Sequence, residues 1–384
     1  MKKINFDNGS TSFPKAPGLG KAISDYVETG AYNINRGNYE KAYEVENLVY
    51  QTRGQIAELF GVKKKRNVIF TPGVTYSINY FVHGFLKRGD HILVSSLEHH
   101  AVMRPLTQRL NEGITADLIP VDSEGNLAID EIEGMLRHNT RAILVTHASN
   151  VCGTVLPIRR LGQICKDRDL IFAVDAAQTA GSLPLSVQED AIDFLAFAGH
   201  KGLLGPQGIG GFVISDRLHG MMQPILMGGT GSDSDQVIMP SFLPDCFEVG
   251  TLNLPGIAGL NHSLQYLMNR GISSIHEKEM ELAGQFLDGA ARLIPQGIVI
   301  GRKDCRNRIA VVSLDFPNDD NARISFELDQ KFGIMTRVGL HCAAAAHQAL
   351  GTFPKGTLRF SFGIFNTPEE VEYCLRALHD IVSE

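Results

Sequence analysis

Short runs of apolar residues alternate with amphipathic stretches between about residues 66 and 215. Several of these runs are apolar throughout instead of alternating with polar residues, as is typical of buried parallel strands. The pattern therefore predicts an α/β fold in which a mostly parallel central sheet carries helices on both faces. The predicted strands are Val68–Thr71, His91–Ser95, Ala142–Thr146, Ile171–Asp175, Phe194–Ala198 and Gly211–Ile214.

The texture of the chain changes after about residue 256, where helical patterns precede further strands. We expect a large domain of residues 16–255 and a smaller α+β domain of residues 256–384, with residues 1–15 packing against the smaller domain. Ahead of the first strand, apolar residues at helical spacing predict a helix that Gly61 ends as a C-cap. The remaining predicted elements are helices Ile257–Leu267 and Ile275–Leu293, strands Ile309–Leu314 and Thr357–Ser361, and a final helix opened by the capping box Thr367–Glu370.

Composition narrows the function classes. Of 384 residues, 43% are hydrophobic and 20% charged, and the net charge of -6 argues against a basic surface that binds nucleic acid. No run of about 18 apolar residues predicts a membrane span, and the N-terminal residues lack the apolar core of a signal peptide. Six cysteines show neither a CxxC pair nor metal-ligand spacing. We therefore expect a cytosolic protein with no disulfide framework, no metal site, and neither nucleic acid nor membrane as a partner.

Polar residues follow the predicted strands at the edge where α/β sheets bind ligands. The turn Thr71–Thr75 contains a glycine and opens a helix, which suits a phosphate, although the same residues can serve only as caps. His99 follows the next strand and can stack on a ring or move protons, unless it belongs to a surface histidine pair. Asn150 offers an amide to a ring hydroxyl.

Two further strand ends carry ionisable residues. Asp175 can pair with a protonated pyridine nitrogen, or it can be a simple N-cap. Lys201 follows an apolar strand between glycines, a position that solvation of a surface explains poorly. A lysine becomes a nucleophile when burial or a neighbouring positive charge lowers its pKa. Taken together, the polar residues at these successive strand ends predict a site for pyridoxal phosphate (PLP), held as a Schiff base on Lys201.

With these residues in place, the chain resembles the class V aminotransferases, and within them the cysteine desulfurase and selenocysteine lyase branch. The resemblance implies PLP fold type I and a homodimer. It is carried by Asp7–Asn8, Asn33–Gly37, Thr71–Asn79, Glu98–His100, Ser149–Asn150, Asp175–Gln178, Gly199–Lys201, Glu248–Asn253, Arg337–Cys342 and Arg359–Thr367.

The resemblance also implies roles around the cofactor. Lys201 resembles the Schiff-base lysine, Asp175 the partner of the pyridine nitrogen, and His99 the stacking histidine. Gln178 and Asn150 resemble contacts to the ring oxygen or the substrate. The residues that resemble the phosphate site are Thr75, the Val74 amide and His200, together with Thr251, which is expected to reach the phosphate of the other subunit.

On the substrate side, Arg359 resembles the arginine that binds the substrate carboxylate, and Asn33 and Asn150 are expected to contact the substrate. One departure concerns the phosphate. Many relatives carry a hydroxyl residue two positions before the histidine of the lysine motif, and this chain has Ala198. We expect that change to remove one hydrogen bond to the phosphate.

Cys342 separates the branches of this family. It follows Arg337 and His341, and positive neighbours such as Arg337 and Arg359 lower a thiol's pKa and raise its thiolate fraction. The short, small and apolar stretch that follows it resembles the group II desulfurases. The alternative is a packed and inert thiol, the role that we assign to Cys152.

The sequence therefore predicts a PLP-dependent cysteine desulfurase, with Lys201, Cys342 and His99 as catalytic residues. It converts L-cysteine to L-alanine, forms a persulfide on Cys342 and passes the sulfur to an acceptor protein or a small thiol. Three alternatives stay open at this point. They are a selenocysteine lyase, another class V aminotransferase or lyase in which Cys342 is incidental, and a scaffold without catalysis.

Overall fold

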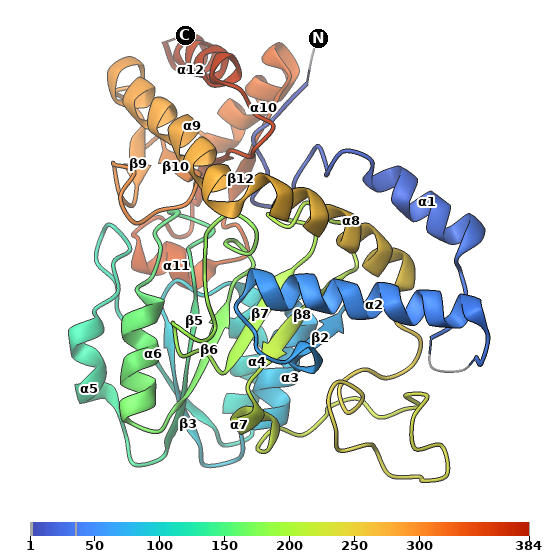
Figure 1. Cartoon of the computed structure of the whole chain (residues 1–384). Coiled ribbons are helices and arrows are strands. Elements are labelled where there is room, and N and C mark those ends of the chain that lie inside the picture. Colours follow the sequence, from blue (N-terminus) through green and yellow to red (C-terminus); the bar gives the residue numbers. More distant parts are fainter. Residues whose placement is uncertain (1–2, 35–36, 384) are drawn as a thin grey trace.

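A seven-stranded sheet forms the centre of the protein, seen here in a computed structural model that describes residues 3–34 and 37–383 (Figure 1). Its strand order is β2-β8-β7-β6-β5-β3-β4, and only β8 runs against its neighbours. The predicted α/β class with a mostly parallel sheet is thus confirmed. The strands are β2 (Val68–Thr71), β3 (His91–Ser95), β4 (Thr115–Ile119), β5 (Thr140–Thr146), β6 (Ile171–Asp175), β7 (Phe194–Ala198) and β8 (Gly210–Ile214).

The central strands are buried on both faces, which explains their continuous apolar sequences. Successive residues alternate between two hydrophobic layers, so that Phe172 and Leu195 face one layer while Ala173 and Phe194 face the other. The first layer is covered by α2 (Glu40–Leu59), α6 (Ile158–Asp167) and α8 (Leu254–Arg270). The second is covered by α3 (Val74–Phe85), α4 (His100–Leu110) and the short α7 (Asp216–His219).

A smaller antiparallel sheet follows, with the order β12-β13-β10-β9. Its strands are β9 (Ile298–Ile300), β10 (Val311–Asp315), β12 (Arg337–Gly339) and β13 (Thr357–Ser361). The first strand, β1 (Ile4–Asn5), pairs in parallel with β11 (Ile334–Met335), so the N-terminal segment lies against the C-terminal part of the chain (Figure 1). Phe6 accordingly belongs to the same buried cluster as Phe286 and Phe360.

Three long helices surround this smaller sheet, and three shorter ones lie elsewhere. The long ones are α9 (Ile272–Leu293), α10 (Asn321–Phe332) and α12 (Pro368–Ser383), and the others are α1 (Leu19–Thr29), α5 (Ile132–Met135) and α11 (Ala344–Ala349). Helix α12 begins at the proline of the predicted capping box, whereas β10 begins two residues later than predicted. The division into domains at residue 256 stays a prediction. Across residues 3–34 and 37–383, no helix is long and apolar enough to cross a membrane.

A buried ion pair fastens the segment that enters α8. The Arg53 guanidinium donates to both carboxylate oxygens of Glu248, and Glu248 also accepts a hydrogen bond from the Phe70 amide at 2.7 Å. Both side chains are almost fully buried, at 8% and 6% exposure. The contact joins α2, β2 and the segment before α8, and removing one partner leaves the other charge buried alone.

We predict that Glu248→Gln lowers the free energy of unfolding by about 3–5 kcal/mol, because Arg53 loses its counterion in a buried place. Urea denaturation of the two proteins measures this loss. The matched control is Asp130→Asn, which breaks the exposed pair with Arg160 and is expected to cost less than about 1 kcal/mol. Equal losses in the two variants would contradict the role given to burial.

Candidate active site

A cavity of about 340 Å³ lies at the carboxyl edge of the large sheet, with the smaller sheet contributing its other wall. Its volume is in the range of sites for small molecules. Ten of the predicted site residues line it: Val74, Thr75, His99, Asn150, Asp175, Gln178, His200, Lys201, Cys342 and Arg359. The structure therefore brings together residues from positions 74 to 359 of the chain.

Lys201 and Asp175 form the ionisable centre of this cavity. Burial lowers the pKa of the Lys201 amine to about 8, while the Asp175 charge opposes this shift. Burial raises the pKa of the Asp175 carboxyl, and its Oδ1 accepts a hydrogen bond from the Ala177 amide at 2.8 Å. A lysine with this pKa is partly neutral near pH 8, as a nucleophile or general base must be.

His99 caps the N-terminus of α4 through its ring. Its Nδ1 accepts a hydrogen bond from the Ala101 amide at 3.0 Å, so the neutral ring carries its proton on Nε2. Burial, together with the charge of Lys201, lowers the pKa of His99 to about 3. The imidazole is therefore neutral at physiological pH, and it can stack or donate a hydrogen bond without carrying charge.

The N-terminus of α3 closes another side of the cavity. The first amides of a helix have no partner within it, and no side chain in the described part of the chain caps α3. Gly73 precedes the helix with a φ of 154°, a conformation that essentially only glycine adopts. Val74 and Thr75 follow at the cavity wall. His200 lines the same cavity, and its buried Nδ1 lacks a partner among the described residues. This arrangement suits an anion.

A strained turn presents the Cys342 thiol to the cavity. Both His341 and Cys342 have positive φ angles, of 48° and 56°, although neither is glycine. Hydrogen bonds hold the turn, since the His100 amide donates to the Cys342 carbonyl at 2.7 Å and the Asn150 side chain donates to the His341 carbonyl at 2.8 Å. Arg337 Nη2 lies 3.6 Å from the Cys342 sulfur. The exposed thiol is thus held in place at one wall of the site.

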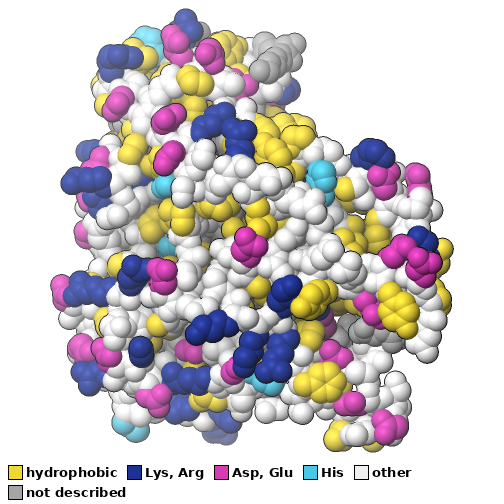
Figure 2. Space-filling model, viewed as in Figure 1, with side chains coloured by type: hydrophobic (Ala, Val, Ile, Leu, Met, Phe, Trp, Pro, Cys, Tyr) yellow, Lys and Arg dark blue, Asp and Glu magenta, His cyan; other side chains and the backbone are white. Residues whose placement is uncertain are grey.

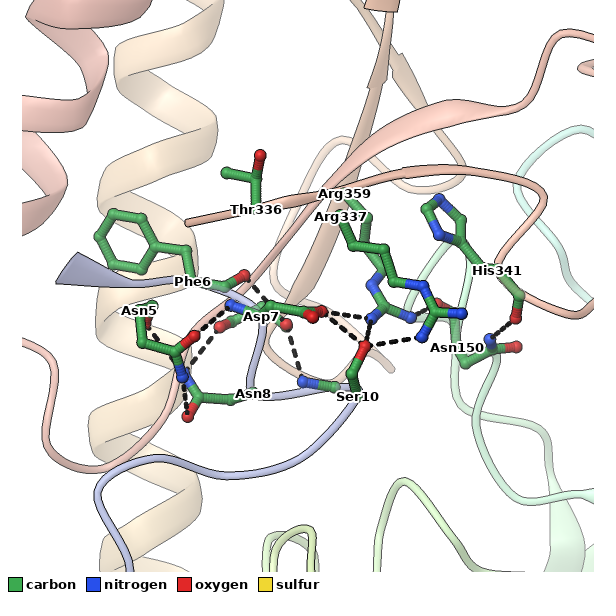
Figure 3. A network of polar contacts seen from close by, with 12 residues as sticks. Asn5, Phe6, Asp7, Asn8, Ser10, Asn150, Thr336, Arg337, His341 and Arg359 are labelled. Atoms are coloured by element: carbon green, nitrogen blue, oxygen red, sulfur yellow. Dashed lines mark hydrogen bonds and ion pairs between the residues drawn. The ribbon is translucent and has the colours of Figure 1, made fainter. Parts of the chain in front are cut away.

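Arg359 is 1% exposed and meets polar groups from three parts of the chain. Its Nη1 donates to the Asn150 carbonyl at 3.1 Å, and its Nη2 donates to Asp7 at 2.8 Å and to Ser10 at 2.9 Å (Figure 3). Arg337 also donates to Ser10, so the two guanidinium groups share this hydroxyl. The positive charges predicted around Cys342 are therefore present at the cavity.

Two predicted residues lie outside the lining of this cavity. Asn33 is partly buried, and its Oδ1 accepts a hydrogen bond from the next amide at 3.0 Å. Thr251 is exposed and lines a neighbouring hollow of about 250 Å³, which shares Pro72 and Tyr76 with the cavity. Asn35 and Arg36 of the segment around Asn33 lie outside the described residues.

The contacts that Asp7 and Ser10 make in this network could not be predicted from the sequence, although Asp7 is among the residues that carry the resemblance. Both residues belong to a polar stretch without strand or helix periodicity, and their contacts lie more than 320 positions away along the chain. Cys152 is buried and donates to the Thr154 hydroxyl at 3.3 Å, so it is packed away from the cavity. Among the described residues, no group of His, Cys, Asp and Glu side chains could hold a metal ion.

Comparison with known proteins identifies the family. The family model described as aminotransferase class-V matches residues 4–374. The chain belongs to the class V aminotransferase family. A probable cysteine desulfurase of Pyrococcus abyssi is 31% identical to this chain. The similarity covers 99% of this chain and 94% of the Pyrococcus abyssi protein. Another from Methanothermobacter thermautotrophicus is 30% identical over 98% and 94%. The apo structure of a cysteine desulfurase from Thermococcus onnurineus NA1 superposes with a TM-score of 0.93, at 31% identity over 99% and 95% of the two chains.

Class V aminotransferases use PLP, and the residues at this cavity fit that cofactor. The buried Asp175 carboxylate accepts one hydrogen bond among the described residues, and a cation such as a protonated pyridine nitrogen would balance its charge. The uncapped amides of α3 and the unpartnered nitrogen of His200 suit a phosphate. Lys201 offers an amine of lowered pKa for covalent attachment.

Ala198 lies at the end of β7 and lines the cavity, 3% exposed. We predict that Ala198→Ser tightens PLP binding about 10- to 150-fold, because one hydrogen bond to the charged phosphate contributes about 1.5–3 kcal/mol. Titration of the apoprotein with PLP, followed by absorbance, measures the affinity. The control is Ala116→Ser on the edge strand β4, away from the cavity. Unchanged affinity in Ala198→Ser would show that the missing hydroxyl does not matter.

Glu98 is fully buried and contacts Thr146, which lines the cavity. It accepts hydrogen bonds from the Ser95 hydroxyl and from the Thr146 amide, and its Oε2 has no partner among the described residues. Burial raises the pKa of this carboxyl from an ordinary 4.5 to about 8, and the nearby Asp175 charge adds to the shift. Between about pH 4.5 and pH 8, Glu98 is therefore protonated in the folded protein and ionised in the unfolded protein.

That difference predicts a pH dependence of stability. The stabilising effect of the Glu98 proton is complete below pH 4.5 and is lost as the pH rises to about 8. Glu98→Gln cannot titrate, so the difference in unfolding free energy between wild type and variant should shift steadily against the wild type across this window. Urea denaturation at several pH values measures it. A difference that stays constant with pH would contradict a protonated Glu98.

Proposed function

We propose that this protein is a PLP-dependent cysteine desulfurase that converts L-cysteine to L-alanine and forms a persulfide on Cys342. The observation that carries the proposal is the presence of Cys342, Lys201 and Arg359 at one cavity. A plain aminotransferase has no use for a thiol held at the cavity wall. The proteins similar to this chain over nearly its whole length are named cysteine desulfurases, which supports the same function.

The cofactor would be held by residues from five strand ends. Lys201 would bind it covalently, Asp175 would keep its ring nitrogen protonated and His99 would stack on the ring. The amides at Val74 and Thr75, together with His200, would bind the phosphate. Gln178 and Asn150 would contact the ring oxygen or the substrate. When bound, PLP withdraws electrons from the α-carbon of an amino acid.

Arg359 and Lys201 would act on the substrate itself. Arg359 orients L-cysteine by its carboxylate, which turns a diffusional encounter into an ordered one. The amine of Lys201, with a pKa lowered to about 8 by burial, then removes the α-proton as a general base. His99 is neutral and donates through Nε2, so it can assist proton transfer without competing for the substrate carboxylate.

The sulfur step belongs to Cys342. Its thiolate attacks the substrate sulfur, so that an S–S bond forms and the bond from sulfur to the substrate β-carbon breaks. The electron pair of the broken bond stays with the carbon, which takes up a proton and becomes a methyl group, and the protonated Lys201 amine returns a proton to the α-carbon to give L-alanine. L-cysteine and the thiol thus give L-alanine and a persulfide. An acceptor thiol, from a protein or a small molecule, then takes the terminal sulfur.

The proposal includes a homodimer in which Thr251 reaches the phosphate bound by the partner subunit. Thr251 is exposed in a hollow beside the cavity. Hydrophobic side chains lie exposed on the long segment between α7 and α8, among them Met227 at 68% and Ile238 at 70%. Figure 2 shows hydrophobic side chains at the lower right, where Figure 1 places part of this segment. An apolar surface next to an exposed site residue supports contact with a second subunit.

We predict that Cys342→Ser abolishes the formation of L-alanine and sulfide from L-cysteine, since a hydroxyl cannot accept the sulfur. Absorbance of the bound cofactor should stay unchanged because Lys201 and Asp175 are intact. Alanine, sulfide and keto-acid products are assayed with and without a reductant. Desulfuration that persists in this variant, or a keto acid as the main product, would refute the proposal.

Two controls accompany this test. Cys152→Ser changes a buried thiol that the proposal does not use, and it should keep full activity. L-selenocysteine is assayed beside L-cysteine, because attack by the same thiolate on selenium releases L-alanine as well. The ratio of kcat/KM for the two substrates then ranks them.

A further inference from the structure

The N-terminal stretch Asp7–Lys15 touches several parts of the active site. The Gln178 side chain donates to the Gly9 carbonyl at 3.0 Å. Lys15 donates to the His200 carbonyl at 2.6 Å, next to the lysine of the site. Asp7 and Ser10 bind the arginines on the opposite wall. This stretch thus connects the cofactor side of the cavity with the substrate side.

Ser10 has the most constrained place in this stretch. Its hydroxyl donates to Asp7 Oδ1 at 2.7 Å and accepts from Arg337 Nη1 at 2.7 Å and from Arg359 Nη2 at 2.9 Å (Figure 3). A hydroxyl has one donor and two acceptor lone pairs, so all three are used. A single oxygen atom therefore fixes the position of both guanidinium groups relative to each other.

The two arginines would otherwise repel each other. Burial lowers the pKa of Arg359, Asp7 opposes this shift and the charge of Arg337 adds to it. Asp7 supplies the balancing negative charge and orients the Ser10 hydroxyl toward itself, which leaves both lone pairs for the arginines. Hydrogen bonds of this kind, with a charged donor, are stronger and more directional than neutral ones.

The two arginines have different roles at the cavity. Arg337 Nη2 lies 3.6 Å from the Cys342 sulfur, while Arg359 is the residue to which the proposed function gives the substrate carboxylate. We propose that Ser10 is a positioning residue that couples these two arginines and so aligns the substrate carboxylate with the attacking thiol. This inference rests on the proposed function. Without the hydroxyl, Asp7 still holds Arg359, but Arg337 loses the contact that fixes its Nη1.

The test uses two alkylating reagents on the cofactor-free protein. Iodoacetate and iodoacetamide react with Cys342 at the same carbon, but only iodoacetate carries a carboxylate that the arginines attract. The rate of alkylation by iodoacetate divided by the rate with iodoacetamide therefore reports how the arginines are placed around the thiol. Cys305 is also exposed, so the measurement is made in a Cys305→Ser background. Labelling at Cys342 is verified by peptide mass.

We expect Ser10→Ala to lower this ratio about ten-fold, as for one lost hydrogen bond to a charged group. Ser10→Thr keeps the hydroxyl and should restore it. In the loaded enzyme, Ser10→Ala should raise KM for L-cysteine while the cofactor absorbance stays unchanged. The matched control is Ser24→Ala, which removes an exposed hydroxyl on α1.

An unchanged ratio in Ser10→Ala would overturn the inference, and so would a Ser10→Thr variant that behaves like Ser10→Ala. Melting temperatures of the variants separate a local effect from unfolding. The alkylation assay requires neither PLP nor turnover. A failure of desulfuration in the wild type would therefore refute the proposed function without deciding the role of Ser10.

Discussion

The burial of Lys201 and Asp175 at the carboxyl edge of the parallel sheet is the constraint on which the site depends. Asp175 is buried and Lys201 is partly buried, and this burial lowers the pKa of the amine and raises that of the carboxyl, while each charge offsets part of the other's shift. The continuous apolar sequences of β6 and β7 create this dry edge. The same sequences that fold the sheet therefore prepare a reactive amine next to a carboxylate that needs a cation.

The opposite wall depends on a meeting of the two ends of the chain. Arg337 and Arg359 come from neighbouring strands of the small sheet, where they stand directly across from each other. Two like charges at such a place need a negative partner, and Asp7 provides it from the N-terminal segment, which bridges to Ser361 beside Arg359. The thiol of Cys342 is then held near these charges by a strained turn. Folding of both chain ends is thus a condition for the substrate side of the site.

Most strands of the large sheet could be predicted from the sequence, because a strand that is buried on both faces has a continuous run of apolar residues. All six predicted strands of the large sheet are present, and β2, β3, β6 and β7 have the predicted bounds. The edge strand β4 was missed because four of its five residues are exposed or only partly buried and two are polar, so its sequence is not continuously apolar. The antiparallel direction of β8 could not be predicted either, since the apolar pattern of a buried strand does not depend on the direction in which the strand runs.

The residues of the candidate site also differ in whether a local sequence pattern could predict them. Residues that directly follow apolar strands could be predicted and all lie at the cavity, as Asp175 and Lys201 do. Ser10 could not be found, because its contacts arise from the approach of distant segments and not from any local pattern. Thr251 and Asn33 lie outside this cavity, and for Thr251 the expectation concerns a second subunit.

The central claim is that the Cys342 thiol takes sulfur from L-cysteine at this cavity. The most direct measurement is the mass of the Cys342 peptide after the PLP-loaded protein has reacted with one equivalent of L-cysteine without reductant. The account predicts that this peptide gains the mass of one sulfur atom, that a reductant removes it, and that one L-alanine is released for each sulfur bound. An unmodified Cys342 peptide with L-alanine formed, or the added sulfur on another cysteine, would contradict it.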